Sequence, residues 1–292
     1  MAEPLVEHVS DTAFWIAHYR AVENERRDPL FRDPLAGVLA GERGQKIAAS
    51  MPRGFMTGWA VVIRTHIIDN FIRYALSQHV DTILNLGAGL DTRPYRMDLP
   101  GSLLWIEADY PAMIEYKEKK LIGQIPQCKL ERMKLDLSNP VERKEMLAAA
   151  QARSKKLLVL TEGVIPYLTV EQAAPLADDL RAVEPACFWI VDYFAPEIYR
   201  YRKRMTRRHL RNAPFQFNPA DWFGFFAQHG WKPREIRYLA EEGERLKRPM
   251  QLTPFLRALF AVRRAVAPAK RREQFRRYAG YVLLERGAYP NS

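Results

Sequence analysis

The spacing of apolar residues changes character near residue 80 of the chain. Before it, apolar positions recur at helical intervals, which predicts helices over 10–26, 35–39 and 57–76. After it, short apolar runs predict strands over 82–86, 103–108, 131–136, 157–161 and 187–193. Helical segments separate these runs, at 111–122, 140–152 and 170–183. Such alternation is typical of an α/β fold, a doubly wound and mostly parallel sheet with helices on both faces. We therefore expect a helical cap followed by such a sheet.

The last third of the chain interrupts this alternation. Residues 195–256 are expected to form a lid insertion, with an aromatic helix within 218–231 and a strand at 233–239. A basic amphipathic helix is predicted at 255–266, and a closing strand at 277–287. We predict a single domain over 1–292, divided into a cap (1–79), a core (80–194), the lid (195–256) and a C-terminal helix and strand (257–292).

A glycine turn and an acid mark the centre of the predicted sheet. Gly87-Ala88-Gly89 directly follows the first strand, and glycine lets the backbone approach a ligand closely. Asp109 comes 20 residues after Gly89, at the end of the second strand. A carboxylate at this place in a doubly wound sheet accepts hydrogen bonds from ribose hydroxyls. The pair therefore predicts a site for a nucleoside cofactor.

The residues after the glycine turn narrow the choice of cofactor. A dinucleotide site has a third glycine where this chain has Thr92. Arg93 and Pro94 follow, and we take them to disfavour the tight helix start that such a site needs. A nicotinamide-dependent oxidoreductase, whose dinucleotide site needs that third glycine, is thus the weaker alternative. A cofactor without a pyrophosphate, S-adenosylmethionine, fits better.

Acidic residues end several of the predicted strands. Ligands of doubly wound sheets bind beyond the carboxyl ends of the strands, where this chain places Asp91, Asp109, Asp136, Glu162 and Asp192. A buried carboxylate needs a partner. Each acid alone is more often a helix cap or part of an ion pair, but together they favour a binding site.

Several of these motifs, in this order, resemble one known family. NLGAGLDTRPYR (85–96), WIEADYPAMIEYKEKKL (105–121), LDL (135–137) and LTEGVIPYLT (160–169) are similar to the leucine carboxyl methyltransferase family. Residues 10–37 and Arg64-Thr65 extend the resemblance upstream. It implies a class I methyltransferase with a seven-stranded sheet, in the bacterial branch of S-adenosylmethionine-dependent O-methyltransferases.

The resemblance also implies roles for individual residues. Cofactor binding is expected from Arg64, Gly87, Gly89, Asp109, Asp136, Leu137 and Glu162. In that scheme Arg64 binds the methionine carboxylate and Asp109 binds the ribose. Asp136 and Leu137 then lie beside the adenine, Glu162 near the α-ammonium, and Tyr167 near the site of methyl transfer. Without the resemblance, Arg64 would be interpreted as an exposed helix charge. Two features depart from the family, namely Gly163 and the basic insertion after Asp192.

Composition limits the other possibilities. The chain has 292 residues, of which 48% are hydrophobic and 27% charged, as in ordinary globular proteins. No apolar run approaches the roughly 18 residues of a membrane span, and we see no secretory signal, so a cytoplasmic location is expected. The two cysteines and six histidines lack metal-ligand spacing, and no metal is predicted. Cys187, inside an apolar run, is expected in the core.

The net charge of +11 is concentrated in two segments. Arg200–Arg211 carries seven Arg or Lys and no acid, and Arg257–Arg277 carries eight against Glu273. A solvated helical face is the simpler interpretation. The alternative is a lid that orders over an anionic acceptor. Nucleic-acid binding is less favoured, because the aromatic residues that could stack on bases have the spacing of a core-facing helix: Trp222, Phe223, Phe225 and Phe226.

The sequence reveals no obvious general base. No histidine falls at a strand end, although His18 could reach the site from the cap. A carboxylate acceptor needs no base, whereas an alcohol or phenol benefits from one. We therefore expect O-methylation of a carboxylate or an acidic hydroxyl on a small molecule. The sequence does not indicate an oligomeric state.

Overall fold

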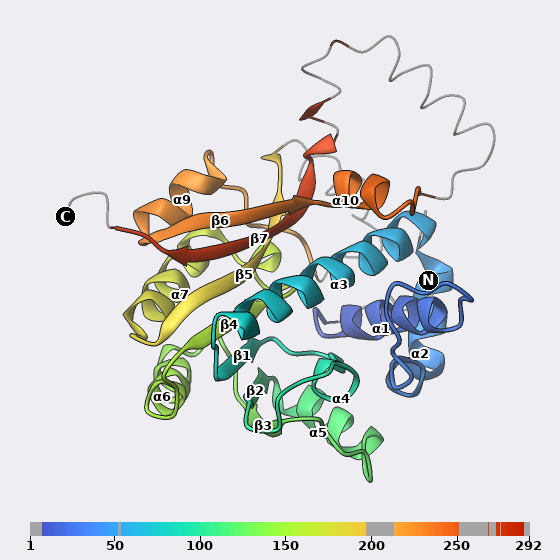
Figure 1. Ribbon diagram of the computed structural model, residues 1–292, viewed down its shortest axis with the longest axis horizontal. Helices are drawn as coiled ribbons and strands as arrows, with labels where there is room; N and C mark the ends of the chain where they lie inside the picture. Colours follow the sequence, from blue (N-terminus) through green and yellow to red (C-terminus); the bar gives the residue numbers. More distant parts are fainter. Residues whose placement is uncertain are drawn as a thin grey trace.

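The computed structural model describes residues 8–51, 54–196, 213–250, 268, 273, 274 and 276–288. Within this part of the chain one seven-stranded sheet has the order β3-β2-β1-β4-β5-β7-β6 (Figure 1). Its strands are β1 (Thr82–Leu86), β2 (Leu104–Asp109), β3 (Lys129–Lys134), β4 (Leu157–Thr161), β5 (Ala186–Phe194), β6 (Trp231–Tyr238) and β7 (Ala279–Arg286). β1 to β5 are parallel, and β7 is antiparallel to β5 and β6. The predicted doubly wound, mostly parallel sheet is confirmed, including its antiparallel closing strand.

The helices follow the predicted order with three differences. They are α1 (Asp11–Asn24), α2 (Ala36–Ser50), α3 (Gly54–Ser77), α4 (Arg93–Arg96), α5 (Pro111–Lys120), α6 (Pro140–Gln151), α7 (Val170–Ala182), α9 (Trp222–Gln228) and α10 (Leu239–Arg245), with the 3-10 turn η1 (Ile165–Tyr167). α2 continues past the predicted end at 39, through a kink at Gly41. α10 was not predicted. A one-turn helix does begin at Arg93, contrary to the prediction, because proline is well tolerated in a first helical turn.

Helices cover both faces of the sheet (Figure 1). The long helix α3 packs one face, where Ile67 and Phe71 meet Leu158 in one apolar cluster. α6, α7 and α9 pack the opposite face, where Leu147 and Leu176 join a second cluster. Because both faces of the sheet are covered, every residue of β1 and β4 is buried and neither strand alternates between apolar and polar positions.

The cap helices α1 and α2 form a third apolar cluster with α5 and with the loop after β1. Phe14 and Trp15 of α1 are buried there, and the ring of Phe14 lies 4.9 Å from that of Tyr116, edge to face. Leu90, directly after the glycine turn, belongs to the same cluster. The cap is therefore seated on the turn that was predicted to bind the cofactor.

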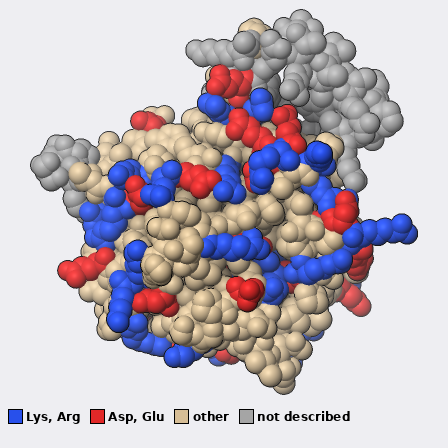
Figure 2. Space-filling view, viewed as in Figure 1, with Lys and Arg blue, Asp and Glu red and all other residues tan. Residues whose placement is uncertain are grey.

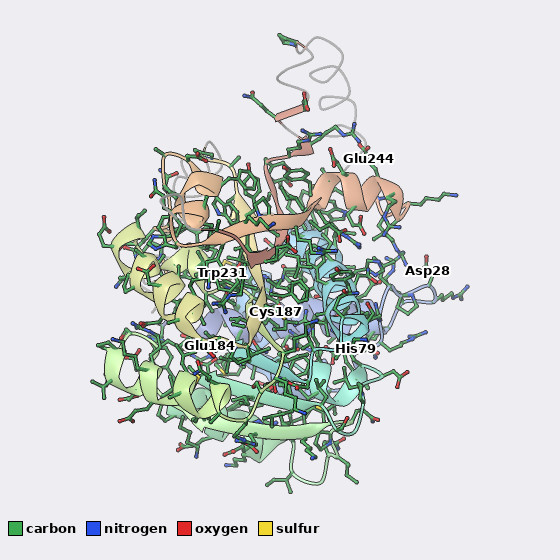
Figure 3. All side chains as sticks on the ribbon, turned by 60° about the vertical axis from the view of Figure 1, so that its left-hand side comes forward. Asp28, His79, Glu184, Cys187, Trp231 and Glu244 are labelled. Carbon is green, nitrogen blue, oxygen red and sulfur yellow. The ribbon has the colours of Figure 1, made fainter. Side chains whose placement is uncertain are left out.

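The aromatic helix α9 belongs to the core. Trp222, Phe225 and Phe226 are buried, and Phe226 lies 5.2 Å from the buried ring of Trp189 on β5. The base-stacking interpretation of these side chains is therefore wrong. In Figure 3, Trp231 and Cys187 lie among the packed side chains of the sheet. Cys187 is only half-buried, whereas Cys128 is the buried cysteine.

The basic segments fall largely outside the described residues. This applies to Arg200–Arg211 and to the predicted helix 255–266, so the lid hypothesis stays a prediction. At the C-terminal end of the second segment, Arg276 pairs with Glu244 and Arg277 with Glu273, both at 2.9 Å. On the face drawn in Figure 2, basic and acidic side chains are interspersed. In the described part of the chain no helix is long and apolar enough to cross a membrane, and no cluster of His, Cys, Asp or Glu could hold a metal.

Candidate functional site

A cavity of about 640 Å³ lies where the carboxyl ends of the parallel strands meet the cap. Its lining comes from α1 and α3, from the loops after β1, β2 and β4, and from β5 and β7. Of the predicted cofactor and transfer-site residues, the lining includes Arg64, Gly87, Gly89, Asp109, Leu137, Glu162 and Tyr167. The fold thus brings together residues up to 103 positions apart in the sequence, from Arg64 to Tyr167.

The turn after β1 has to be made of glycine. Gly87 and Gly89 have φ angles of 65° and 48°, in the left-handed region that side chains rarely adopt. A Cβ atom on Gly87 would lie 2.5 Å from Cγ2 of Val164, and one on Gly89 would lie 3.2 Å from Cβ of Ala13. The turn is therefore tight against both the β4 loop and the cap.

Asp109 is fixed at the end of β2 by that turn. Its Oδ2 accepts a hydrogen bond from the Gly89 amide at 2.6 Å, and its Oδ1 accepts one from the Tyr110 amide at 2.7 Å. Burial raises the pKa of the carboxyl group although both amide bonds act to lower it. Each oxygen keeps acceptor capacity, so the carboxylate is preorganised to receive hydroxyl donors from the cavity.

Asp136 is not at the end of a strand, because β3 ends at Lys134. Its carboxylate accepts from the Ser138 amide at 2.8 Å, in the turn before α6, and it is absent from the described cavity lining. Its neighbour Leu137 does line the cavity. Burial and the nearby Asp136 carboxylate raise the pKa of Tyr110, which also lines it. The adenine role of Asp136 stays a prediction.

Arg64 points from α3 towards the end of β4. Its Nη2 lies 2.9 Å from Oε1 of Glu162, and its side chain is only 17% exposed. The alternative that Arg64 is an exposed helix charge is therefore wrong. Burial acts to lower the pKa of Arg64, but Glu162 and other anions outweigh it and raise that pKa. Its Nε is buried without a hydrogen-bond partner among the described residues.

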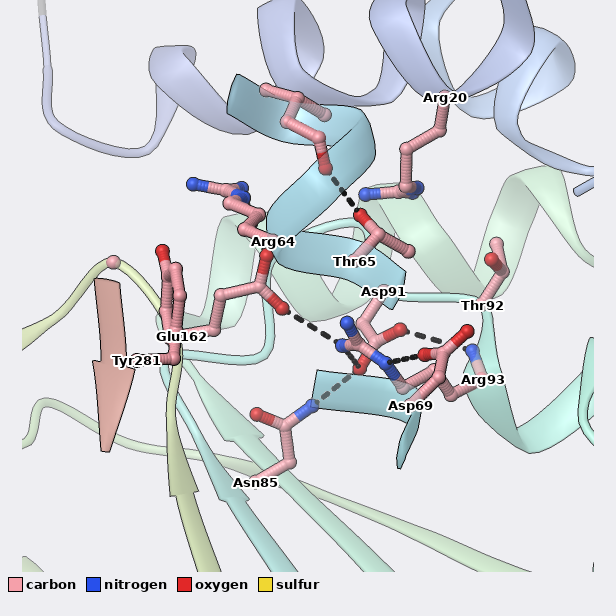
Figure 4. Close-up of polar contacts among 12 residues, drawn as sticks. Arg20, Arg64, Thr65, Asp69, Asn85, Asp91, Thr92, Arg93, Glu162 and Tyr281 are labelled. Carbon is pink, nitrogen blue, oxygen red and sulfur yellow. Dashed lines mark hydrogen bonds and ion pairs between the residues drawn. The ribbon is translucent and has the colours of Figure 1, made fainter. Parts of the chain in front are cut away.

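Arg93 joins three carboxylates beneath the glycine turn (Figure 4). Its Nε donates to Asp69 on α3 at 2.8 Å. Its Nη1 donates to Asp91 at 2.9 Å and to Glu162 at 2.8 Å. Asn85 of β1 donates to the same Asp91 oxygen at 2.9 Å. Because Arg93 is 2% exposed, these bonds tie α3, the loop after β1 and the end of β4 together in a low-dielectric environment.

Further ion pairs extend this network to α1. Arg96 pairs with Asp69 at 2.7 Å, Arg20 of α1 pairs with Asp33 at 2.8 Å, and the Thr92 hydroxyl donates to Asp33 at 2.7 Å. We call these groups the buried ion-pair cluster: Arg20, Arg64, Arg93 and Arg96 with Asp33, Asp69, Asp91 and Glu162. Burial would raise the pKa values of Asp69, Asp91 and Glu162, but the neighbouring arginines outweigh it and hold them below their usual values.

Asp192 and Tyr281 form a second polar group of the cavity, beside Arg64 and Glu162, and Figure 4 shows Tyr281 next to Glu162. The Tyr281 hydroxyl donates to Oδ1 of Asp192 at 2.8 Å, and the Gly163 amide donates to Oδ2 at 2.9 Å. Both side chains belong to residues only 3% exposed, and both line the cavity. Burial raises the pKa of Asp192 to about 6. It also raises the pKa of Tyr281 above its usual value, with Asp192 as a further cause.

Neither the role of Arg93 nor the Asp192–Tyr281 pair was predicted from the sequence. Acids at buried strand ends need partners, and Arg93 and Arg96 stand in the same motif as the glycine turn. The buried acids and the two arginines together could therefore have predicted the ion pairs. Tyr281 had none, because its meeting with Asp192 depends on the register between β5 and β7, where these two residues are directly opposite. His18 is not among the described residues that line the cavity, so the structure does not support it as the base.

Comparisons with known proteins agree with this geometry. The model of the family described as "Leucine carboxyl methyltransferase" matches residues 13–181. A Mycobacterium tuberculosis protein named as an S-adenosyl-L-methionine-dependent methyltransferase is 28% identical over 261 residues, which cover 80% of this chain and 83% of the relative. A Frankia alni protein with the same kind of name is 30% identical over 189 residues, covering 60% and 65%.

Two solved structures share the fold. One, from Thermobifida fusca and named as a methyltransferase, superposes with a TM-score of 0.54 at 13% identity and covers 93% of this chain and 94% of its own. The other, a DUF574 family protein from Streptomyces avermitilis, has a TM-score of 0.52 at 12% identity, with coverage of 93% and 97%. The family match spans more than half of the chain and contains the glycine turn, Asp109 and Glu162. The chain therefore belongs to the leucine carboxyl methyltransferase family.

Proposed function

We propose that this protein transfers the methyl group of S-adenosylmethionine to an oxygen atom of a small molecule, either a carboxylate or a hydroxyl. One observation carries the proposal. The glycine turn, the fixed carboxylate of Asp109 and the guanidinium of Arg64 line the same cavity, although they come from three separate elements. Its volume of about 640 Å³ lies within the range of about 300–1,000 Å³ usual for small-molecule sites.

The chemistry of the lining fits the parts of the cofactor. Asp109 would accept from the ribose hydroxyls, and the Leu137 amide would face the adenine, with Asp136 close by. Arg64 lines the cavity, where its guanidinium would bind the methionine carboxylate. Glu162 lies near enough to Arg64 to receive the α-ammonium of the same methionine. When bound, the cofactor supplies an electrophilic methyl group on a sulfonium.

The protein would act mainly by positioning. Methyl transfer is a displacement in line with the breaking bond, so holding the acceptor oxygen close to the methyl carbon and excluding water supplies much of the rate. Tyr167 on η1 lines the cavity, and its ring meets that of Phe215 edge to face at 5.0 Å. We propose that Tyr167 forms a wall of the transfer site. Because the cap, the core and the segment after β5 all contribute to one cavity, we also propose that the chain works as a single domain.

Mass spectrometry of the purified protein after mild desalting tests the cofactor, together with calorimetric titration of S-adenosylhomocysteine. We expect retained S-adenosylmethionine or S-adenosylhomocysteine, or a titration with one site per chain. Transfer of a labelled methyl group to a mixture of small metabolites then tests the activity. A folded protein that binds neither compound would refute the proposal.

A further inference from the structure

The lining of the cavity changes in chemistry along the sheet, from a side that we call the cofactor end to an adjoining side that we call the acceptor end. The cofactor groups lie at the ends of β2, β1 and β4, where Asp109, the glycine turn and Glu162 follow one another in strand order. Asp192 on β5 and Tyr281 on β7 come next in that order, beyond Glu162. They lie beside Arg64 and Glu162, next to the proposed place of the methionine part of the cofactor.

The walls around this pair are aromatic. Phe194, Phe215 and Tyr278 line the cavity there, and the rings of Phe194 and Phe215 are 5.6 Å apart. Aromatic walls with one polar group at the base suit a flat apolar ligand that carries a single polar substituent.

Asp192 differs from the other acids of the site in its partners. Asp69, Asp91 and Glu162 each form an ion pair with an arginine, whereas the donors to Asp192 in the described structure are a phenol and a backbone amide. The charged groups that face it are Arg64 from α3 and Glu162 from the end of β4, which act on it with opposite sign. Asp192 thus keeps the capacity to take up a proton.

We propose that Tyr281 and Asp192 form a relay that receives an uncharged hydroxyl acceptor and removes its proton, so that the natural acceptor is an aromatic or apolar alcohol or phenol. This inference rests on the proposed methyl transfer and chooses between its two acceptor classes. The acceptor hydroxyl donates to Oη of Tyr281, whose own proton moves to Oδ1 of Asp192. As the oxygen–methyl bond forms, the sulfur–methyl bond breaks and its electron pair stays on sulfur.

The same groups disfavour a carboxylate acceptor. A carboxylate arrives without a proton, so it gives the relay nothing to remove and places a second negative charge beside Asp192. Two neighbouring negative charges repel each other strongly in a buried site. A general base works best when its pKa is near the operating pH, and the Asp192 carboxyl, with a pKa raised by burial to about 6, meets this condition.

Two probes with the same ring system test the inference: 2-naphthol, which is uncharged, and 2-naphthoate, which carries a carboxylate. Each is titrated by calorimetry into the protein saturated with S-adenosylhomocysteine. At pH 8 we expect 2-naphthol to bind at least about tenfold more tightly than 2-naphthoate. Lowering the pH to 5.5 protonates Asp192 and should remove most of this preference, since a carboxylic acid with an ordinary pKa stays ionised there.

Variants separate a relay from a merely structural pair. Asp192→Asn should improve 2-naphthoate binding by about tenfold and make the preference independent of pH. Transfer of labelled methyl to 2-naphthol should fall by about 100-fold or more in Asp192→Asn, and by a smaller factor in Tyr281→Phe. Both variants should bind S-adenosylhomocysteine like the wild type. Tyr74→Phe, on α3 and outside the described cavity lining, is the matched control.

Several results would overturn the relay. These are equal or tighter binding of 2-naphthoate by the wild type, binding of neither probe to protein that holds S-adenosylhomocysteine, no transfer to bound 2-naphthol, or unchanged transfer in Asp192→Asn. The wild-type comparison of the two probes needs no variant, so it decides even where a variant fails to fold. Failure to bind S-adenosylhomocysteine is a different result, because it refutes the proposed function itself.

Discussion

The buried carboxylates at the two ends of the cavity have different kinds of partner. At the cofactor end, the buried ion-pair cluster sets each carboxylate against at least one arginine, as Arg93 does for Asp69, Asp91 and Glu162. At the acceptor end, Asp192 is held by a phenol and an amide. The first arrangement keeps its acids ionised, whereas the second leaves its carboxyl group able to change protonation state.

This difference matches what each end is proposed to bind. The cofactor carries a sulfonium, an ammonium and a carboxylate, and groups of fixed charge are suited to orient such a zwitterionic ligand. The proposed acceptor brings a proton that has to leave, and a group that titrates near neutral pH is suited to take it. Mutations that remove the charge at either end should therefore have opposite effects on stability.

The largest expected effect is that of Arg93→Ala. Three carboxylates would lose a shared buried cation, and breaking a buried ion pair from one side costs about 3–5 kcal/mol. For a chain of this size the melting temperature should fall on the order of 10 °C. Differential scanning calorimetry at pH 7.5 measures it.

The matched control is Arg153→Ala, which breaks the exposed pair with Glu131 on the surface. Exposed pairs contribute about 0–1 kcal/mol. Equal melting temperatures for the two variants would show that the cluster at the cofactor end contributes no more than a surface pair, and the contrast between the two ends would be lost.

In contrast to Arg93→Ala, Asp192→Asn should raise the free energy of unfolding at neutral pH. The pKa of Asp192 is raised from 3.8 to about 6 in the folded protein, so between these values the folded state binds more protons than the unfolded state. Its contribution to the free energy of unfolding therefore decreases as the pH rises from 4 to 6, and stays low above 6. The total change corresponds to about 3 kcal/mol.

An asparagine keeps both hydrogen bonds without this cost, since its oxygen can accept from the Gly163 amide and its amide group can donate to the rotated Tyr281 hydroxyl. Urea unfolding at pH 4, 5, 6 and 7.5 should show the variant near the wild type at pH 4, and more stable by up to about 3 kcal/mol at pH 7.5. A difference that does not grow between pH 4 and 6 would mean that Asp192 does not titrate in this range.

Asp109→Ala tests the cofactor end by binding. Loss of charge-assisted hydrogen bonds of about 1.5–3 kcal/mol should weaken S-adenosylmethionine binding by roughly 10–100-fold. Part of this loss comes from the glycine turn, because the Gly89 amide loses its acceptor. Asp98→Asn, at an exposed position between β1 and β2 in the chain, serves as the control. Calorimetric titration of a folded Asp109→Ala protein with wild-type affinity would remove Asp109 from the cofactor site.

The comparison of the two ends also explains what could be predicted from the sequence. The residues of the cofactor end are predicted from local sequence: the glycine turn and Glu162 directly follow an apolar strand and Asp109 ends one, so strand order alone brings them together. Asp136 shows the limit of that reasoning, since β3 ends two residues earlier than predicted. The cause is that β3 is the edge strand and only partly buried, so its apolar pattern is weak.

The acceptor end could not be predicted in the same way. Tyr281 is separated from Asp192 by 89 residues and reaches it through antiparallel pairing of β7 with β5. A shift of this register by one residue would move Tyr281 to the other face of the sheet. Neither the residue types nor their spacing predicts this register, whereas the residues of the cofactor end are predicted from the strand next to each of them in the chain.

The smallest expected effect is that of Arg64→Lys, which asks whether the cofactor end requires the shape of an arginine or only its charge. A lysine can keep the ion pair with Glu162, now 2.9 Å from Nη2 of Arg64, but it lacks the planar fork that binds a carboxylate through two parallel bonds. Losing one charge-assisted bond should weaken S-adenosylmethionine binding by about tenfold, with little change in melting temperature. Arg73→Lys, an exposed position on the same helix, controls for changes in α3 itself. If calorimetry finds the same cofactor affinity for Arg64→Lys, Arg73→Lys and the wild type, Arg64 serves only to neutralise Glu162, and the methionine carboxylate is bound elsewhere.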